Sequence, residues 1–383
     1  MNKIYFKSPT AFVVENRCTD ELHIYLKKLG ITKCLVVTDP TINKLGMVER
    51  ITEKAGAHGI ELVVYADCEP EPPVGNMESA LKQYQAERCQ GIVGLGGGSA
   101  MDVAKAAAML VTNGGSYQDY IGVNRVPKRC APLILIPTTS GTGSEVSMFS
   151  IMMVDGVKAG VCDENITAHI ALVNPELTAT VPRNITASTG LDAFCHLLEC
   201  YISVYANSMS DMIALEGLGY VWKYLRKAVG DGGNSEARYW MSYASALGGF
   251  GPNLVDGCAA NHGFAFALGA VYHLGHGLAN ALMLPYVFPV VARAELEKMP
   301  KLAAVVGISA DGKTNLELVS EISDAIRGLV EDVGCFKPLS QFGATPADLD
   351  RLVDEANLQT RVMGHSSWKL SSEEIREIFR CAL

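Results

Sequence analysis

The sequence lacks an excess of basic residues. Its 32 lysines and arginines are outnumbered by 41 aspartates and glutamates, which gives a formal net charge of -9. A nucleic-acid partner requires a basic face that neutralises phosphates, so this balance argues against one. The same balance disfavours an anionic membrane surface. We therefore expect a small-molecule partner, and neither nucleic acid nor a membrane.

Paired cysteine motifs and a signal-peptide core are also missing. The 11 cysteines are odd in number and none forms a C-x-x-C pair, which is typical of reduced thiols in a cytosolic protein. The first ten residues, MNKIYFKSPT, contain no apolar run of the signal-peptide kind. The most apolar long stretch, 277–292, is too short to span a bilayer and is interrupted by Asn280, Pro285 and Pro289. We therefore expect a cytoplasmic protein.

The 383 residues fall into two parts that differ in their sequence pattern. This length is greater than one hydrophobic core usually serves. Up to about residue 182, apolar β-branched runs alternate with helix-like segments, which is typical of a parallel α/β sheet. The runs are 34–38, 62–65, 91–95 and 133–136. Beyond them, Ala-, Leu- and Met-rich helical stretches dominate, and Thr186 or Ser188 is expected to cap the first helix. We predict an α/β nucleotide-binding domain over 1–182 and an all-helical domain over 183–383.

A glycine-rich turn follows one predicted strand. The run Gly91–Leu95 leads into Gly96-Gly97-Gly98-Ser99, and we expect a helix to begin near Asp102. Glycines at such a turn let backbone N–H groups approach a phosphate, although glycine-rich turns also serve close packing alone. A second polar tract, PTTSGTGSE at 137–145, follows another predicted strand. Two such loops at the ends of adjacent parallel strands suit a nucleotide.

Asp39 follows the predicted strand 34–38 directly. A carboxylate there can accept hydrogen bonds from ribose hydroxyls and repel a 2′-phosphate, which favours NAD over NADP. A turn aspartate before Pro40 is an equally good interpretation. Because Asp39 precedes the glycine turn, the pattern differs from the standard dinucleotide fingerprint, in which the acidic residue comes later.

A carboxylate and three histidines form the strongest chemical signal. Asp192 and His196 are four residues apart in a helical segment, so both point from one face. His262 and His276 lie in a second segment. One carboxylate and three imidazoles suit a borderline divalent ion such as Fe²⁺ or Zn²⁺. The alternative is a set of hydrogen-bonded core histidines.

The second segment must turn if its two histidines share an ion. On one unbroken helix, positions 262 and 276 would lie about 21 Å apart. Gly269, Gly275 and Gly277 are placed to allow a turn between them. His273, in the same stretch, is a further ligand, a cofactor neighbour or a hydrogen-bonded rim residue. We assign Glu199 and Cys195, beside His196, to structure.

Four motifs together resemble a known family. GGGSAMDVAK, PTTSGTGSEV, TGLDAFCHLLE and NHGFAFALGAVYHLGHGLANALMLPYV occur in this order over nearly the whole chain, and they resemble the iron-containing (group III) alcohol dehydrogenases. The resemblance implies a dehydroquinate-synthase-like fold with the active site in the cleft between an α/β nucleotide domain and a helical metal domain. It implies a metal-dependent, NAD(H)-linked oxidoreductase that interconverts a small primary alcohol and its aldehyde by hydride transfer.

The resemblance also implies site residues. The implied metal ligands are Asp192, His196, His262 and His276, holding one divalent ion, Fe²⁺ with Zn²⁺ or Mn²⁺ as alternatives. The implied cofactor positions are Asp39, Gly97, Gly98, Ser99, Asp102, Thr138, Thr139, Thr142 and Lys158. Lys158 matches a lysine on the nicotinamide side, and we count it with His273 as catalytic. We further expect a homodimer or a larger homo-oligomer.

The chain departs from the family pattern at three places. In the family pattern, a histidine to which proton transfer is often assigned follows the position of His262 by four residues. This chain has Phe266 there, which excludes proton transfer through that position. Between two prolines it has Glu71 instead of asparagine. Its tail 363–368, MGHSSW, replaces the Asn-Pro-Arg segment common near the C-terminus. These departures predict an unusual substrate preference.

Two other functions are weighed against this one. A lyase or phosphate-substrate enzyme of the same fold, such as a dehydroquinate synthase, needs several basic residues converging on its substrate. Between Arg183 and Arg293 the basic residues are Lys223, Arg226, Lys227 and Arg238, none of them next to a metal segment. A non-catalytic metal- or nucleotide-binding protein is the second alternative, and Phe266 is the only argument for it.

Overall fold

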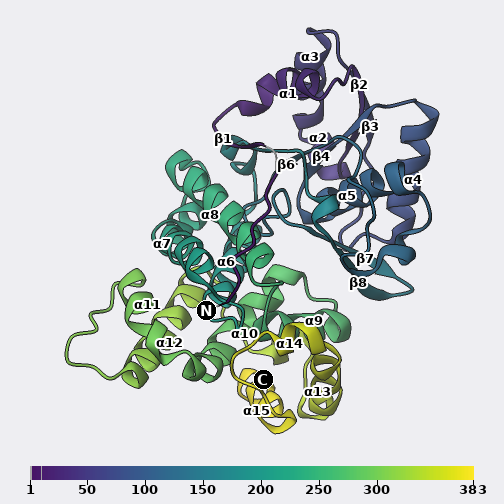
Figure 1. Ribbon diagram of the computed structural model, residues 1–383. Helices are drawn as coiled ribbons and strands as arrows, with labels where there is room; N and C mark the ends of the chain where they lie inside the picture. The colour runs from purple at the N-terminus through teal and green to yellow at the C-terminus, as the bar shows by residue number, and fades with distance from the viewer. Residues whose placement is uncertain (1, 10) are drawn as a thin grey trace. The chain divides into compact units, whose positions relative to one another are not determined.

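The computed structural model describes residues 2–9 and 11–383 (Figure 1). Its contacts divide the chain into two compact units. The α/β unit comprises residues 7–180 and the helical unit residues 181–383. The segment that ends at Phe6 belongs with the helical unit, far from it in sequence.

A six-stranded parallel sheet forms the centre of the α/β unit. Its strands, in spatial order, are β1 (Ala11–Val14), β9 (Ile170–Val173), β6 (Leu133–Pro137), β4 (Gly91–Gly96), β2 (Lys33–Val37) and β3 (Glu61–Tyr65). All four strands expected from the sequence are present, within one residue at each end. β1 and β9, each four residues long, were not expected from the sequence.

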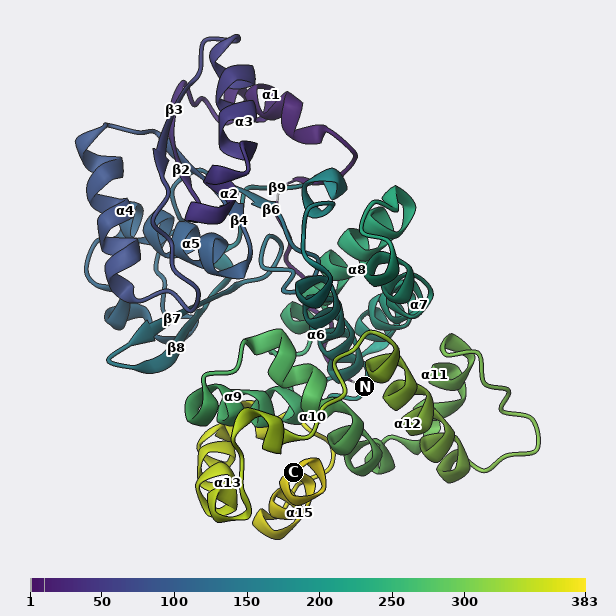
Figure 2. The same ribbon diagram turned by 180° about the vertical axis from the view of Figure 1, so that it is seen from behind.

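Helices cover both faces of this sheet (Figures 1 and 2). The helices are α1 (Leu22–Lys28), α2 (Pro40–Lys44) and α3 (Met47–Gly56) on one face, and α4 (Val74–Ala86) and α5 (Gly98–Asn113) on the other. Side chains of β2 alternate between the two cores, Cys34 and Val36 in one, Leu35 and Val37 in the other. A strand buried on both faces reads as a continuous apolar run, as this one does.

The strand order places a switch point between β2 and β4. From β2 the chain goes to β3 on one side and returns to β4 on the other. In open parallel sheets, ligands bind outside the carboxyl ends of the strands at such a switch point, here β2 and β4. Asp39 follows β2 and the glycine turn follows β4.

A small sheet completes the α/β unit. It consists of β5 (Gly122–Val123), β8 (Val157–Cys162) and β7 (Phe149–Val154), in that order. β7 and β8 form an antiparallel hairpin through Asp155 and Gly156, whose φ angles are 50° and 80°. Asp-Gly with two positive φ values is the favoured tight turn of a hairpin.

The helical unit is built around α6 (Arg183–Tyr201), which is largely buried and contacts the next four helices. These are α7 (Ser208–Gly230), α8 (Ser235–Leu254), α9 (Ala260–Tyr272) and α10 (His276–Val291). The remaining helices are α11 (Met299–Val305), α12 (Asn315–Asp332), α13 (Leu349–Leu358), α14 (Thr360–Gly364) and α15 (Ser372–Ala382). The expected side-chain cap of α6 is wrong, because the helix begins before both candidates: Thr186 donates to the Val181 carbonyl (3.2 Å) and Ser188 to that of Ile185 (3.3 Å).

Pro285 and Pro289 lie inside α10, which continues through both, and the expectation that this apolar stretch is too short to span a bilayer is wrong. Each proline removes one backbone donor, but contacts of α10 with α6, α9 and α12 stabilise the helix. With the following turn, the helical run His276–Ala294 spans 19 residues and is long and apolar enough to cross a membrane. Its most apolar window is 61% buried inside the unit, as in the core helix of a globular protein.

Candidate functional site

The two predicted phosphate loops touch each other in the α/β unit. A Cβ atom on Gly98 would lie 3.0 Å from a methyl group of Thr142, and one on Gly97 would lie 3.7 Å from the Thr139 hydroxyl. The Thr138 amide donates to the Gly96 carbonyl (3.0 Å). The structure therefore brings both loops together at the carboxyl ends of β4 and β6.

Helix α5 begins earlier than expected. Its first residue is Gly98, four positions before Asp102, because Gly97 serves as the N-cap. The first N–H groups of the helix, which have no partner within the helix itself, therefore belong to the glycine turn, and Ser99 lies half-buried in the first turn. This arrangement strengthens the case for an anion site at the turn.

Asp102 uses both of its carboxylate oxygens within the protein. One accepts a hydrogen bond from the Ser144 hydroxyl (2.7 Å) and the other from the Ile151 amide (3.0 Å). The carboxylate thus joins α5 to the second loop and to β7. In this structure Asp102 positions the loops.

A buried cation lies beneath the same loops. The ammonium group of Lys105 donates to the hydroxyls of Ser144 (2.8 Å) and Ser147 (3.1 Å) and to the carbonyl of Phe149 (2.7 Å). Burial lowers the pKa of Lys105 to about 8 and raises the pKa of Glu145 to about 7. Neither carboxyl oxygen of Glu145 has a hydrogen-bond partner among the described residues.

Asp39 has the structural role of a turn residue and also faces the glycine turn. Its Oδ1 accepts hydrogen bonds from the amides of Thr41 (2.8 Å) and Ile42 (3.0 Å), which caps α2. Its Oδ2 lies 3.4 Å from the position of a Cβ on Gly96. The two interpretations of Asp39 are therefore compatible in one conformation.

The two residues predicted as catalytic lie in different units. In the α/β unit, Lys158 on β8 pairs with Glu71, with 2.5 Å between Nζ and Oε1. Glu71, the departure between the two prolines, thus neutralises the lysine expected near the nicotinamide. In the helical unit, His273 is exposed at the end of α9 and does not belong to the group of predicted metal ligands.

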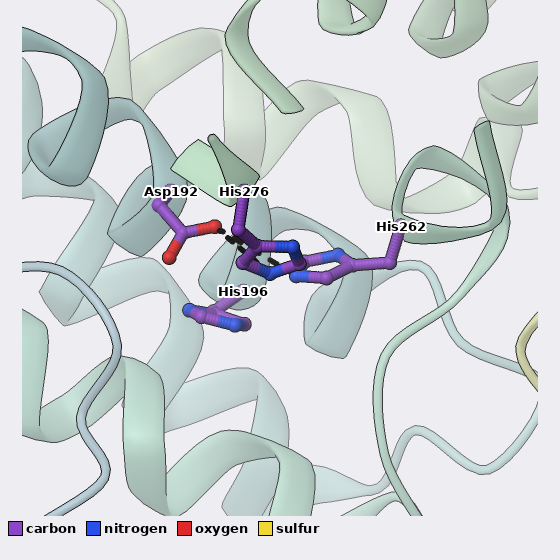
Figure 3. A group of neighbouring side chains, drawn as sticks. All are labelled: Asp192, His196, His262 and His276. Atoms are coloured by element: carbon purple, nitrogen blue, oxygen red, sulfur yellow. Dashed lines mark ion pairs between the residues drawn. The ribbon is translucent and has the colours of Figure 1, made fainter. Parts of the chain in front are cut away.

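The four predicted metal ligands come together in the helical unit (Figure 3). Asp192 and His196 come from α6, His262 from α9 and His276 from the first turn of α10. One possible ligand atom from each lies within 4.8 Å of all the others. Oδ1 of Asp192 is 3.9 Å from Nε2 of His262 and 3.6 Å from Nε2 of His276. We call these four side chains the metal group.

The turn between α9 and α10 lies at residues 273–275. Of the three expected glycines, Gly275 lies in it as the N-cap of α10, whereas Gly269 lies inside α9 and Gly277 inside α10. His273 has a φ of 55°, a left-handed conformation that histidine tolerates better than most side chains. Gly277 acts differently, by close approach: a Cβ there would lie 2.7 Å from the Ser188 carbonyl oxygen and 3.4 Å from Cβ of Asp192. Its missing side chain lets the start of α10 lie directly against α6.

The metal group has the polar atoms that a cation would satisfy. Nδ1 of His196 and Nε2 of His262 are buried without a hydrogen-bond partner among the described residues. Burial acts to raise the pKa of Asp192, but the three histidines outweigh it, so the pKa lies below its usual value. Leaving buried nitrogen atoms unpaired costs free energy. The group therefore fits a divalent ion.

Two neighbours that sequence reasoning missed orient the metal group. Glu199 accepts hydrogen bonds from the ring Nδ1 and the backbone amide of His262. Such carboxylate partners orient metal-binding imidazoles, so the purely structural assignment of Glu199 was incomplete. Asn280 donates to Oδ1 of Asp192 (2.8 Å). The available signal was spacing, because Glu199 follows His196 by three residues and Asn280 follows His276 by four.

Phe266 lies against the metal group, as expected from its position one turn after His262. Its ring centroid is 5.5 Å from that of His276, in a stacked arrangement, and 6.2 Å from that of His262. An apolar ring therefore lies where the family pattern has a titratable one.

Comparison with known proteins agrees with this geometry. The pattern of the iron-containing alcohol dehydrogenases matches residues 9–175, and the C-terminal pattern of the Fe-containing alcohol dehydrogenase family matches residues 186–383. The chain belongs to the iron-containing alcohol dehydrogenase family. The expected family, fold class and enzyme class are confirmed, and the matched family is one of dehydrogenases, not of lyases.

Three similar proteins illustrate the range of this alcohol dehydrogenase family. Long-chain-alcohol dehydrogenase 1 of Geobacillus thermodenitrificans is 36% identical over 366 residues, or 95% of this chain and 92% of that protein. The crystal structure of a 1,3-propanediol oxidoreductase has a TM-score of 0.96 and 30% identity over 100% of both chains. Sulfoacetaldehyde reductase of Bifidobacterium kashiwanohense, solved in complex with NAD⁺, has a TM-score of 0.90 and 27% identity over 99% and 98% of the chains.

Proposed function

We propose that this protein is a metal-dependent, NAD(H)-linked oxidoreductase that interconverts a small primary alcohol and its aldehyde. The observation that carries the proposal is the metal group, in which three imidazoles surround one buried carboxylate and two ring nitrogens have no hydrogen-bond partner among the described residues. Membership of the family supports the reaction class.

Asp192, His196, His262 and His276 are the proposed ligands of one divalent ion, Fe²⁺ with Zn²⁺ or Mn²⁺ as alternatives. Bound there, the ion would supply Lewis-acid polarisation of the alcohol or aldehyde oxygen. One carboxylate and three neutral imidazoles leave a net charge of about +1 at the site. Glu199 orients His262 and Asn280 orients Asp192, which prepares the ligand geometry in advance.

The glycine turn and the threonine loop are the proposed site of the NAD(H) pyrophosphate. Support comes from the switch point of the sheet, the helix N-terminus at Gly98 and the contact of Gly98 with Thr142. Asp39 is proposed to select NAD(H) by repelling a 2′-phosphate. A similar protein of known structure, the sulfoacetaldehyde reductase, was solved with NAD⁺.

Proton transfer is proposed to pass around Phe266, because a phenyl ring neither accepts nor donates a proton. Solvent, the ribose hydroxyls of the cofactor and His273 are the proposed carriers, and His273 is exposed at the end of α9. Lys158 is proposed to act on the nicotinamide side of the cofactor. Glu71 accepts a hydrogen bond from the ammonium group of Lys158 and holds it in one position. The proposed role of Lys158 is therefore to orient the cofactor and to contribute to the local charge.

Small substrates are proposed because the Phe266 ring occupies space beside His276. The family does not determine substrate size, since the similar proteins are named for a long-chain alcohol, 1,3-propanediol and sulfoacetaldehyde. The choice of substrate therefore depends on side chains of this chain.

An absorbance assay of NADH, with a graded series of short to long primary alcohols and their aldehydes, tests the proposed function. We expect turnover that falls as the chain lengthens. Binding of NAD(H) and metal without any turnover would favour the non-catalytic alternative. Conversion of a phosphorylated or carboxylated substrate without net change of NAD(H) would favour the lyase.

Cytoplasmic location and homo-oligomerisation remain proposals. All 11 cysteines are free and nine of them are buried, which supports a reducing compartment. Cell fractionation checks the location, and sedimentation of the purified protein checks the oligomeric state.

A further inference from the structure

A second group of ligand-type side chains lies behind the metal group. It consists of Glu199 on α6, Cys258 in the segment between α8 and α9, and His262 on α9. One possible ligand atom from each lies within 4.8 Å of the other two. We call these three side chains the thiol group. It has His262 in common with the metal group, and Cys258 also interacts with His196.

The conformation of the segment that carries Cys258 is held by several contacts. Asp256 and Gly257 both have positive φ angles, 61° and 121°, a conformation that costs free energy at the aspartate. Arg361 pairs with the Asp256 carboxylate (3.1 Å), and Nδ1 of His365 donates to the Cys258 carbonyl (3.0 Å). The C-terminal segment thus holds the backbone of Cys258 beside the metal group.

The donors of the thiol group differ in kind from those of the metal group. A sulfur, an imidazole nitrogen and a carboxylate oxygen form a set that binds Zn²⁺ or Cd²⁺, because thiolates select soft and borderline ions. Glu199 and His262 are buried, whereas Cys258 is half-buried. Because Cys258 is half-buried, solvent reaches this residue, and a site with three protein ligands takes water as its fourth.

We propose that Glu199, Cys258 and His262 form a second, thiolate-containing position for a soft divalent ion such as Zn²⁺ or Cd²⁺. The position is coupled to the metal group through His262. Glu199 now holds the His262 ring through Nδ1, while Nε2 faces Asp192. An ion bound at the thiol group coordinates Glu199, which then no longer accepts the hydrogen bond from Nδ1 of His262. His262 therefore becomes a poorer ligand of the metal group. Excess Zn²⁺ or Cd²⁺ therefore displaces the resident ion or weakens its binding.

Titration with Cd²⁺ tests this proposal, because a cadmium–thiolate bond absorbs in the ultraviolet and the metal group contains no sulfur. The purified protein is titrated with its own metal in place, under a thiol-free reductant. We expect the absorption band to grow up to one equivalent of Cd²⁺, with release of the resident metal measured in parallel. Cys258→Ser, a nearly isosteric change, should abolish the band. Cys381→Ser is the matched control, because Cys381 is an exposed thiol beside Glu377 (3.4 Å) and should not contribute.

Asp192→Asn separates the two positions, since it weakens the metal group and leaves the thiol group intact. This variant should keep the cadmium band, and circular dichroism confirms that each variant is folded. A band of equal amplitude in Cys258→Ser, or no band in the unaltered protein, would overturn the proposal. Loss of the band in Asp192→Asn would also overturn it, because the thiol would then bind metal only as part of the first site.

Discussion

The phosphate loops of the α/β unit and the metal group of the helical unit are built in opposite ways. The loops are short, continuous stretches that follow neighbouring strands and are rich in glycine and hydroxyl side chains. The metal group takes single side chains from three helices, and its geometry depends on how those helices contact one another. A local site therefore tolerates changes elsewhere, whereas a site assembled from distant helices depends on the core around it.

The largest expected effect separates the two sites directly. His262→Ala removes a metal ligand and the ring partner of Glu199, so the variant should lose its metal and its turnover. Its affinity for NAD(H) should be unchanged, because the phosphate loops lie in the other unit. Metal analysis and cofactor titration give the two readouts. His273→Ala is the control and should keep the metal while lowering turnover; full metal content in His262→Ala would remove His262 from the ligand set.

A buried acid beneath the loops predicts a pH dependence of stability in the α/β unit. Burial raises the pKa of Glu145 to about 7 from 4.5, so the native form keeps a proton that the unfolded chain releases between these two pH values. The free energy of unfolding should therefore fall by up to about 3 kcal/mol as the pH rises through this window. Glu145→Gln should flatten the curve, as measured by denaturant unfolding at pH 5 and pH 7. An unchanged slope in the variant would assign the dependence to other groups.

Gly277 tests how strongly the metal group depends on helix contact. Gly277→Ala places a methyl group 2.7 Å from the Ser188 carbonyl oxygen, so α10 must move away from α6. We expect a loss of about 1–3 kcal/mol in the free energy of unfolding and weaker metal binding. Gly275→Ala is the matched control, since no atom lies within 4 Å of its Cβ position. Equal metal affinity in both variants would show that the metal group adapts to the movement of α10.

Asp39 tests whether the α/β unit selects the cofactor locally. Asp39→Asn keeps an oxygen for the cap of α2 and removes the negative charge, so stability should hardly change. The preference for NAD(H) over NADP(H), measured as the ratio of kcat/KM values, should fall roughly tenfold, or about 1.4 kcal/mol. An unchanged ratio would show that Asp39 is a turn residue only.

The smallest expected effect concerns Phe266. Phe266→His places a titratable ring beside His276, in the position of a larger phenyl ring. We expect activity to persist and the pH profile of kcat to acquire an additional dependence near the usual pKa of histidine. Phe266→Leu is the control that changes volume without adding a titratable group. Identical pH profiles for the unaltered protein, Phe266→His and Phe266→Leu would mean that the side chain at position 266 does not affect proton transfer.

Local patterns in the sequence predicted most of the fold and all of the metal group. Four of the six strands of the main sheet were found, because strands buried on both faces form continuous apolar runs. Of the two missed strands, β1 is only half-buried along its length, whereas β9 is a buried apolar run like the four that were found. The start of α5 was misplaced because glycine has low helix propensity, and only the fold shows that Gly98 already has a helical conformation.

The sequence by itself determined which residues have the right chemistry: a carboxylate and histidines at helical spacing, and glycines and threonines after apolar runs. Tertiary structure alone decided how they are held. It placed the turn between α9 and α10 at His273, gave Gly277 its role in close helix contact, and brought Glu199 and Cys258 to His262. The physical reason is that the chemistry of a ligand is a property of one side chain. Its orientation depends instead on which helices approach closely enough to bring several ligands together.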